Sequence, residues 1–263
     1  MLTRRDALRL LGATGGAGLL AGSGILSLAG RAAASRTQAT PISRTLQGDV
    51  VPGALGDGAV LFHEHFSIQI GPNPSFHADV DLMVSEARAA RADGVALIVD
   101  GGHPDMLRDL AALQRITRES GLPVVASGGY YMQRTYPPDI ATKSAEQIAD
   151  DLVSEARRDR LGAFGEIGQQ TGVLTADERK AVARAHVRTG IPVFTHNAYN
   201  IRATDVPREA ALRQLDIYES AGANPGNLCI GHMCCLDDPA AEIAIQIARR
   251  GAYVGFDRVT LNG

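Results

Sequence analysis

The segment that ends in His63-Glu64-His65 is the part of the chain whose residue types and spacing most clearly suit chemistry. It closes an apolar run over residues 59–62, and in a β-strand side chains two positions apart point to the same face. His63 and His65 would then present two imidazoles to one place, while Glu64 faces elsewhere. Such a pair is either half of a metal site or two histidines in a turn.

Three later residues could complete a metal site, because Glu166, His196 and His232 each close an apolar, strand-like run. Together with the first pair they form a set of five ligands suited to two adjacent divalent cations, with zinc favoured and the carboxylate as the bridge. Two such cations lower the pKa of water and polarise a carbonyl or phosphoryl oxygen, so hydrolysis is the expected chemistry. The alternative for Glu166 is a buried structural carboxylate, which is costly without a cationic partner.

The elements that must position these residues alternate regularly along the chain. Apolar runs predict strands at 59–65, 95–101, 123–129, 163–168, 191–196, 228–232 and 252–257. Helical spacing predicts helices at 79–93, 105–120, 144–160, 175–189, 206–222 and 238–250. Repeated βα units with functional residues at strand C-terminal ends predict a (β/α)8 barrel of the TIM type, incomplete because about seven units are present and the eighth strand is missing. The first strand is not followed by a Gly-x-Gly-x-x-Gly motif, which disfavours dinucleotide binding.

The first residues predict an export signal. Thr3-Arg4-Arg5-Asp6 is a twin-arginine pattern, and a stretch rich in Gly, Ala and Leu leads to an Ala-x-Ala site ending at Ala34. We expect a Tat-type signal peptide over 1–34, a linker over 35–44 and the enzyme domain over 45–263. A membrane anchor is the alternative, but the many glycines favour cleavage. The protein would then be periplasmic or extracellular, without stable membrane association once the signal is removed.

Composition narrows the class of protein. With 263 residues, 45% hydrophobic and 21% charged, the chain can bury a sizeable core. Its net charge of −3 becomes more negative without the four arginines of the signal, which disfavours a nucleic-acid partner. We therefore expect a small-molecule substrate. A homodimer stays open. Cys229, Cys234 and Cys235 crowd one stretch, which excludes a disulfide framework and favours buried free thiols over a zinc site.

The first strand also carries a family resemblance. Residues 58–65 resemble the first-strand signature of the phosphotriesterase-like family of the amidohydrolase superfamily, with Val60 where Thr is usual. Further matching motifs follow in order: Gly165-Glu166-Ile167-Gly168, Thr195-His196-Asn197, Ile230-Gly231-His232 and Gly255-Phe256-Asp257-Arg258. The resemblance implies a binuclear metal-dependent hydrolase of ester-like bonds, of phosphotriesterase or lactonase type.

The resemblance also implies roles for the ligands. His63 and His65 would bind one metal, and His196 and His232 the other. Many family members bridge the metals with a carboxylated lysine from strand four, but the only lysines here, Lys143 and Lys180, lie in or beside predicted helices. Glu166 instead resembles the glutamate variant of the family, in which the bridging carboxylate is built in.

Residues beyond the ligands are further candidates. Tyr130 and Tyr131 follow the third strand, and Asp257 and Arg258 end the seventh at a family position that lines the pocket. We expect Tyr131 and Asp257, with Glu166, to be catalytic, and Tyr130, Tyr131 and Arg258 to contact substrate; packing roles or an ion pair are equal alternatives.

The chain departs from the family in two ways. Cys235 stands where the family has an aspartate that relays protons, and the sequence ends before the eighth strand, which carries a metal-binding aspartate in the family. We therefore expect either that the sequence is a fragment or a truncated product, or that the final strand is supplied in some other way. Two other functions stay open: a TatD-type deoxyribonuclease, which shares the motif at 165–168, and a non-catalytic metal-binding remnant. Lactones, phosphotriesters and other esters are equal candidates as substrate, because fold and metal site do not set specificity.

Overall fold

A computed structural model of the chain describes residues 41–66, 68, 79–168, 176–199 and 206–257. Contacts between Cα atoms separate residues 1–39 from a unit formed by residues 40–263, and only the second unit is described below. The expected signal peptide at 1–34 and the candidate Arg258 lie outside the described residues. Within them, no helix is long and apolar enough to cross a membrane.

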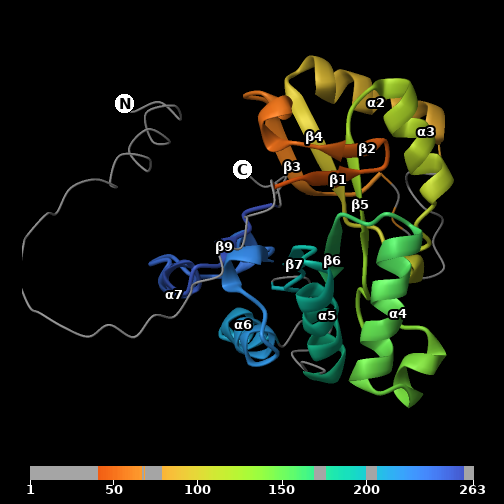
Figure 1. Ribbon diagram of the computed structural model, residues 1–263. Coiled ribbons are helices and arrows are strands. Elements are labelled where there is room, and N and C mark those ends of the chain that lie inside the picture. The colour runs from red at the N-terminus through yellow and green to blue at the C-terminus, as the bar shows by residue number, and fades with distance from the viewer. Residues whose placement is uncertain (1–40, 67, 69–78, 169–175, 200–205, 258–263) are drawn as a thin grey trace, which may run out of the picture. The chain divides into compact units, whose positions relative to one another are not determined.

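Seven parallel strands form one sheet whose spatial order is the order of the chain. The strands are β3 (Ala59–Glu64), β4 (Val95–Asp100), β5 (Val124–Gly128), β6 (Ala163–Ile167), β7 (Val193–Thr195), β8 (Leu228–Ile230) and β9 (Tyr253–Val254). The sheet curls into an incomplete barrel (Figure 1), in which β3 and β9 each pair on one side only among the described residues. This confirms the predicted incomplete (β/α)8 fold.

Helices connect successive strands. They are α2 (Val80–Ala92), α3 (Leu110–Ser120), α4 (Ala145–Arg158), α5 (Ala176–Thr189), α6 (Ala210–Ser220) and α7 (Glu242–Arg249). Short 3-10 turns lie at η1 (Pro52–Leu55), η2 (Pro104–Met106), η3 (Pro138–Thr142), η4 (Pro225–Asn227) and η5 (Met233–Cys235). Because crossovers between parallel strands are right-handed, successive helices cover the same outer face of the sheet, as Figure 1 shows.

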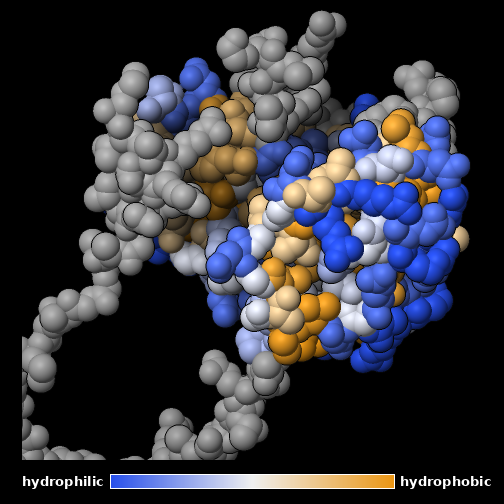
Figure 2. Space-filling view, turned by 90° about the horizontal axis from the view of Figure 1, so that it is seen from above, coloured by the Kyte–Doolittle hydropathy of each residue, from blue (hydrophilic) through white to orange (hydrophobic). Residues whose placement is uncertain are grey.

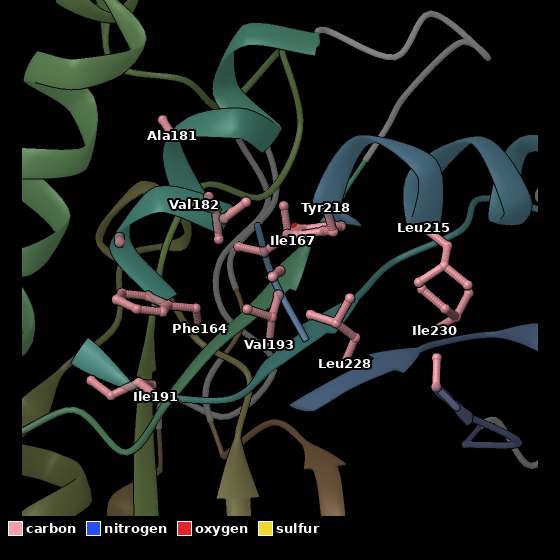
Figure 3. Close-up of a cluster of buried hydrophobic side chains, with 14 of the residues drawn as sticks. Phe164, Ile167, Ala181, Val182, Ile191, Val193, Leu215, Tyr218, Leu228 and Ile230 are labelled. Carbon is pink, nitrogen blue, oxygen red and sulfur yellow. The ribbon is translucent and has the colours of Figure 1, made fainter. Parts of the chain in front are cut away.

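The largest core cluster lies between the second half of the sheet and helices α4 to α7. Figure 3 shows part of it, with Phe164 of β6, Val193 of β7 and Ile230 of β8 on the sheet side and Leu215 and Tyr218 on α6. All five side chains are at most 2% exposed. This packing fixes the strands that carry the later candidate ligands.

Some element boundaries differ from those predicted. The predicted helix at 105–120 is interrupted, because η2 comes first and the Asp109 side chain caps a new start by accepting from Ala112 N. The predicted helix at 238–250 begins only at Glu242, because the Asp238 carboxylate accepts the backbone N–H groups of residues 242 and 243. A hairpin of β1 (Ser43–Thr45) and β2 (Gly48–Val50) was not predicted, and its first strand begins inside the expected linker.

The inner face of the curled sheet encloses a half-open apolar cavity of about 540 Å³. Side chains from the strands line it, among them Val60, Leu97, Val125 and Tyr253. Val60 is 47% exposed and Tyr253 67% exposed, so the two edge strands present apolar surface. Figure 2 shows that hydrophobic residues are also exposed on the face seen from above, with hydrophilic residues around them on the right of the view.

Candidate metal centre

The carboxylate of Glu166 lies at the centre of the candidate site. Glu166 is in β6 and is 2% exposed. One oxygen, Oε2, lies 3.0 Å from His63 Nε2 and 2.9 Å from His65 Nε2. The other, Oε1, lies 3.1 Å from His232 Nε2 and also contacts His196 Nδ1. The five residues predicted to bind metal are therefore brought together, with one pair of imidazoles on each oxygen.

Strand β3 and the residue after it position the first pair as the alternation of side chains predicts. His63 and His65 point to the same carboxylate oxygen, whereas Glu64 between them is exposed. The turn that follows is held by Asp100, at the end of β4, whose carboxylate accepts from Phe66 N at 2.8 Å and from Gly102 N at 2.9 Å. The direction of His65 thus depends on a buried carboxylate of the neighbouring strand.

The ends of β7 and β8 position the second pair. His196 directly follows β7, and His232 adopts a left-handed conformation with φ of 57° two residues after β8. Such a conformation is unfavourable for a side chain with a Cβ and is found mainly where surrounding contacts enforce it. Gly231 lets the backbone before His232 approach the end of β7 closely, because a Cβ there would lie 2.1 Å from the Thr195 carbonyl oxygen.

Asp257, just beyond β9, joins two of the histidines from the side opposite Glu166. Its Oδ2 lies 2.8 Å from His63 Nδ1, and its Oδ1 lies 2.8 Å from His232 Nδ1. The same Oδ1 accepts from His232 N at 3.0 Å. His63 and His232 stack with their ring centroids 4.8 Å apart, and each ring lies between two carboxylates.

Electrostatics at the site follow from this arrangement. Burial alone would lower the pKa of His63, but the carboxylates of Glu166 and Asp257 raise it to about 10. Burial alone would raise the pKa of Glu166, but the histidines around it, His196 and His63 foremost, hold it well below the usual range. Burial lowers the pKa of His196, which favours the neutral imidazole that metals require.

The two tyrosines predicted to line the site have different surroundings. The ring of Tyr131 lies edge-on to that of His196, with centroids 5.0 Å apart, and Tyr131 is 5% exposed. Tyr130 instead packs against Tyr136, and burial together with the carboxylates of Glu155 and Asp151 on α4 raises its pKa to about 12. The structure therefore brings Tyr131, and not Tyr130, to the candidate ligands.

The three cysteines are free thiols, as expected, but only Cys235 is buried, whereas Cys229 and Cys234 are half-buried. Cys235 is buried and belongs to the main hydrophobic cluster. Cys234 is half-buried, with its sulfur 3.9 Å from Asp257 Oδ1. The thiol that replaces the relay aspartate thus packs with core side chains.

Two residues near the site were missed by sequence analysis. Asp100 carried a usable signal, because a carboxylate that closes an apolar strand needs polar partners. Gln214 carried none, since a glutamine inside a helical pattern is ordinarily solvent-exposed. It is fully buried and donates to the carbonyl of His196 at 3.3 Å.

The residues present fit a divalent cation. One ligand atom each from His63, Glu166 and His232 lie within 4.8 Å of one another. His65 Nδ1 and His196 Nε2 are buried and have no hydrogen-bond partner among the described residues. The site thus holds imidazole nitrogens whose bonding capacity the described residues leave unused. Imidazole and carboxylate ligands are those that zinc and similar divalent ions prefer.

Comparisons with known proteins agree with this geometry. The phosphotriesterase homology protein of Escherichia coli (strain K12) is 29% identical over 221 residues, which cover 78% of this chain and 71% of the relative. A crystal structure of that protein, with phosphate in its active site, superposes with a TM-score of 0.69 at 26% identity and covers 78% of this chain and 72% of its own.

Two further relatives carry names of hydrolases. An aryldialkylphosphatase of Saccharolobus solfataricus is 27% identical over 78% of this chain and 67% of the relative. The N-acetyltaurine hydrolase of Danio rerio is 27% identical over 79% of this chain, which spans only 62% of that protein. The sequence model of the phosphotriesterase family matches residues 43–263. The chain belongs to the phosphotriesterase family, and its relatives are hydrolases.

Proposed function

We propose that the chain is a metal-dependent hydrolase of ester-like bonds in phosphotriesters or lactones, working with two divalent cations, of which zinc is favoured. One observation carries the proposal: four imidazoles divide evenly between the two oxygens of Glu166. A carboxylate with a separate pair of imidazoles on each oxygen is suited to bridge two cations. His63 and His65 would hold one, and His196 and His232 the other.

Divalent cations bound there would supply Lewis acidity toward a substrate oxygen and would lower the pKa of water. The chain's own residues set the protonation that this requires. Asp257 would accept the Nδ1 protons of His63 and His232, so that the neutral forms of both imidazoles direct their Nε2 lone pairs toward Glu166. We therefore assign Asp257 the role of fixing the tautomer of two ligands. Tyr131 stays the candidate for contact with substrate, because its ring lies against His196.

The relatives support the substrate class. The name of the Saccharolobus relative indicates a phosphotriester, that of the Danio relative indicates an amide, and the Escherichia coli structure holds phosphate in its active site. All of these groups present a carbonyl or phosphoryl oxygen. The family match over residues 43–263 favours this function over the deoxyribonuclease, and we propose a small-molecule substrate in an exported, periplasmic or extracellular protein.

The test is turnover with and without metal. The purified protein would be stripped with a chelator, dialysed, and supplied with Zn²⁺, Mn²⁺ or Co²⁺. Hydrolysis of an aryl phosphotriester, a δ-lactone, an aryl carboxylic ester and an N-acyl amine would then be measured. We expect metal-dependent turnover of the phosphotriester or the lactone, and its loss in Glu166→Gln. A protein that binds metal but hydrolyses none of the four would be a metal-binding remnant, which contradicts the proposal.

A further inference from the structure

Helix α6 sends one polar side chain, Gln214, into the interior behind the candidate metal centre. Gln214 is 0% exposed, and its amide forms hydrogen bonds with residues at the C-terminal end of β7. Its Oε1 accepts from Thr195 Oγ1 at 2.9 Å and from Asn197 Nδ2 at 3.1 Å. Its Nε2 donates to the carbonyl oxygen of His196 at 3.3 Å. A single amide thus holds His196 and both of its neighbours in the chain.

The same network reaches the second ligand of this pair. Asn197 Nδ2 also donates to the Gly231 carbonyl at 3.1 Å, and Gly231 N donates to Thr195 Oγ1 at 3.3 Å. Gly231 directly precedes His232, which adopts the left-handed conformation described above. The backbone on which His196 and His232 are mounted is therefore tied together through Gln214 and Thr195.

This network is buried throughout, since Thr195, Asn197 and Gln214 are each 0% exposed. A buried amide costs free energy unless its hydrogen bonds are made, and packing alone would be served as well by an apolar side chain. Inside the protein, hydrogen bonds are strong and directional, so such a network fixes relative positions better than apolar contacts do. Apart from Gln214 itself, the donors and acceptors here all belong to the two strand ends that carry ligands.

We propose that Gln214 is a positioning residue, which holds His196 and His232 in the geometry that binds a divalent cation without touching the cation itself. The inference rests on the proposed function, because it concerns metal affinity at that site. It adds a residue from the outer helical layer to the machinery of the site. Residues that orient ligands from behind commonly change metal affinity by roughly 10- to 100-fold when they are replaced.

The test compares variants that remove the network with variants that spare it. Gln214→Met keeps the length of the side chain but makes no such hydrogen bonds, and Thr195→Val removes the hydroxyl that links Gln214 to Gly231. Thr195→Ser keeps that hydroxyl. Leu215→Ala is the matched control, because Leu215 is the next residue of α6, is also 0% exposed and belongs only to the apolar core (Figure 3).

For each full-length protein, Co²⁺ affinity would be measured by competition with a chelator, alongside the visible spectrum of the Co²⁺ complex and the thermal midpoint of the metal-free form. We expect Gln214→Met and Thr195→Val to weaken affinity by roughly 10- to 100-fold and to change the spectrum. Thr195→Ser should bind like the wild type. Leu215→Ala should lower the thermal midpoint without changing affinity or spectrum.

Two results would overturn the inference: unchanged affinity in the variants that remove the network, or an equal loss in Leu215→Ala, which would reveal general loosening. If Gln214→Met does not fold, Thr195→Val against Thr195→Ser decides the matter. A wild-type protein that binds no Co²⁺ would instead overturn the proposed function, so the two failures are distinguishable.

Discussion

Replacing Asp257 should weaken metal binding, and asparagine should be almost as harmful as alanine. The carboxylate accepts from Nδ1 of both His63 and His232, at 2.8 Å each. Asparagine has the same size but offers one oxygen and one N–H donor group. Whichever histidine faces that donor must accept at Nδ1 and carry its proton on Nε2. That nitrogen is the one directed at Glu166, and when protonated it cannot bind a cation.

The size of the effect follows from the number of bonds lost. Hydrogen bonds to a charged group contribute about 1.5–3 kcal/mol each, and Asp257→Asn misdirects at least one ligand. Loss of a carboxylate that orients a ligating histidine costs roughly 10- to 100-fold in metal affinity, which corresponds to about 1.4–2.7 kcal/mol. We expect Asp257→Asn and Asp257→Ala to fall in this range.

The assay is competition for Zn²⁺ with a coloured chelator near neutral pH. Asp237→Asn is the matched control, since Asp237 is an exposed aspartate in the same C-terminal part of the chain and should leave affinity unchanged. Circular dichroism would show that each variant is folded. Wild-type affinity in folded Asp257→Asn would refute the reasoning, because it would mean that the tautomers of His63 and His232 do not depend on Asp257.

Three further predictions concern other parts of the structure. Metal uptake should not depend on bicarbonate, because β6 provides Glu166 and no lysine; a marked rise in uptake with bicarbonate would show that a carbamate forms elsewhere. In the metal-free protein the pKa of His63 is raised from 6.5 to about 10, so its contribution to stability is full below pH 6.5 and is lost as pH rises through 10. Thermal midpoints should fall over this range and fall less in His63→Asn, and identical profiles would contradict the shift. Because β3 and β9 each have one edge that no other described strand pairs with and Tyr253 is 67% exposed, the protein should self-associate, and Tyr253→Lys should reduce light scattering; a wild type that stays monomeric at high concentration would contradict this.

The repeating elements of the fold could be predicted because each is encoded locally. Apolar runs and helical spacing located all seven strands of the sheet and the helices between them. The helix starts predicted at residues 105 and 238 were wrong. Asp109 and Asp238 accept backbone N–H groups and so set later helix starts. The hairpin of β1 and β2 has strands of three residues, too short for any periodicity to show.

The candidate site was predictable where residues able to bind metal lie at the ends of predicted strands. His63, Glu166 and His232 each close an apolar run, and parallel strands bring such ends to one edge of the sheet. The two contacts of Asp257 were not predictable, because its partner His63 is 194 positions away in the chain and the pairing exists only once the sheet has curled. The same holds for Gln214, whose role depends on which face of α6 meets the sheet.

The divergent surroundings of Tyr130 and Tyr131 show the limit of such reasoning. Both follow β5, and adjacent residues beyond a strand end need not point the same way. Tyr131 turns to His196, while Tyr130 turns to Tyr136 near α4. Their position in the sequence predicts that both tyrosines lie near the end of the strand. It does not predict which of the two reaches the site.

The zinc content of the reconstituted protein tests the central claim most directly. After removal of excess zinc, elemental analysis would be made of the wild type, His63→Ala, His196→Ala and, as a control, His186→Gln, a buried histidine whose ring pairs with the Ile191 carbonyl, away from Glu166. The proposed centre predicts about two zinc ions per wild-type chain, fewer in His63→Ala and in His196→Ala, and the wild-type content in His186→Gln. Equal zinc content in the wild type, His63→Ala and His196→Ala would contradict it.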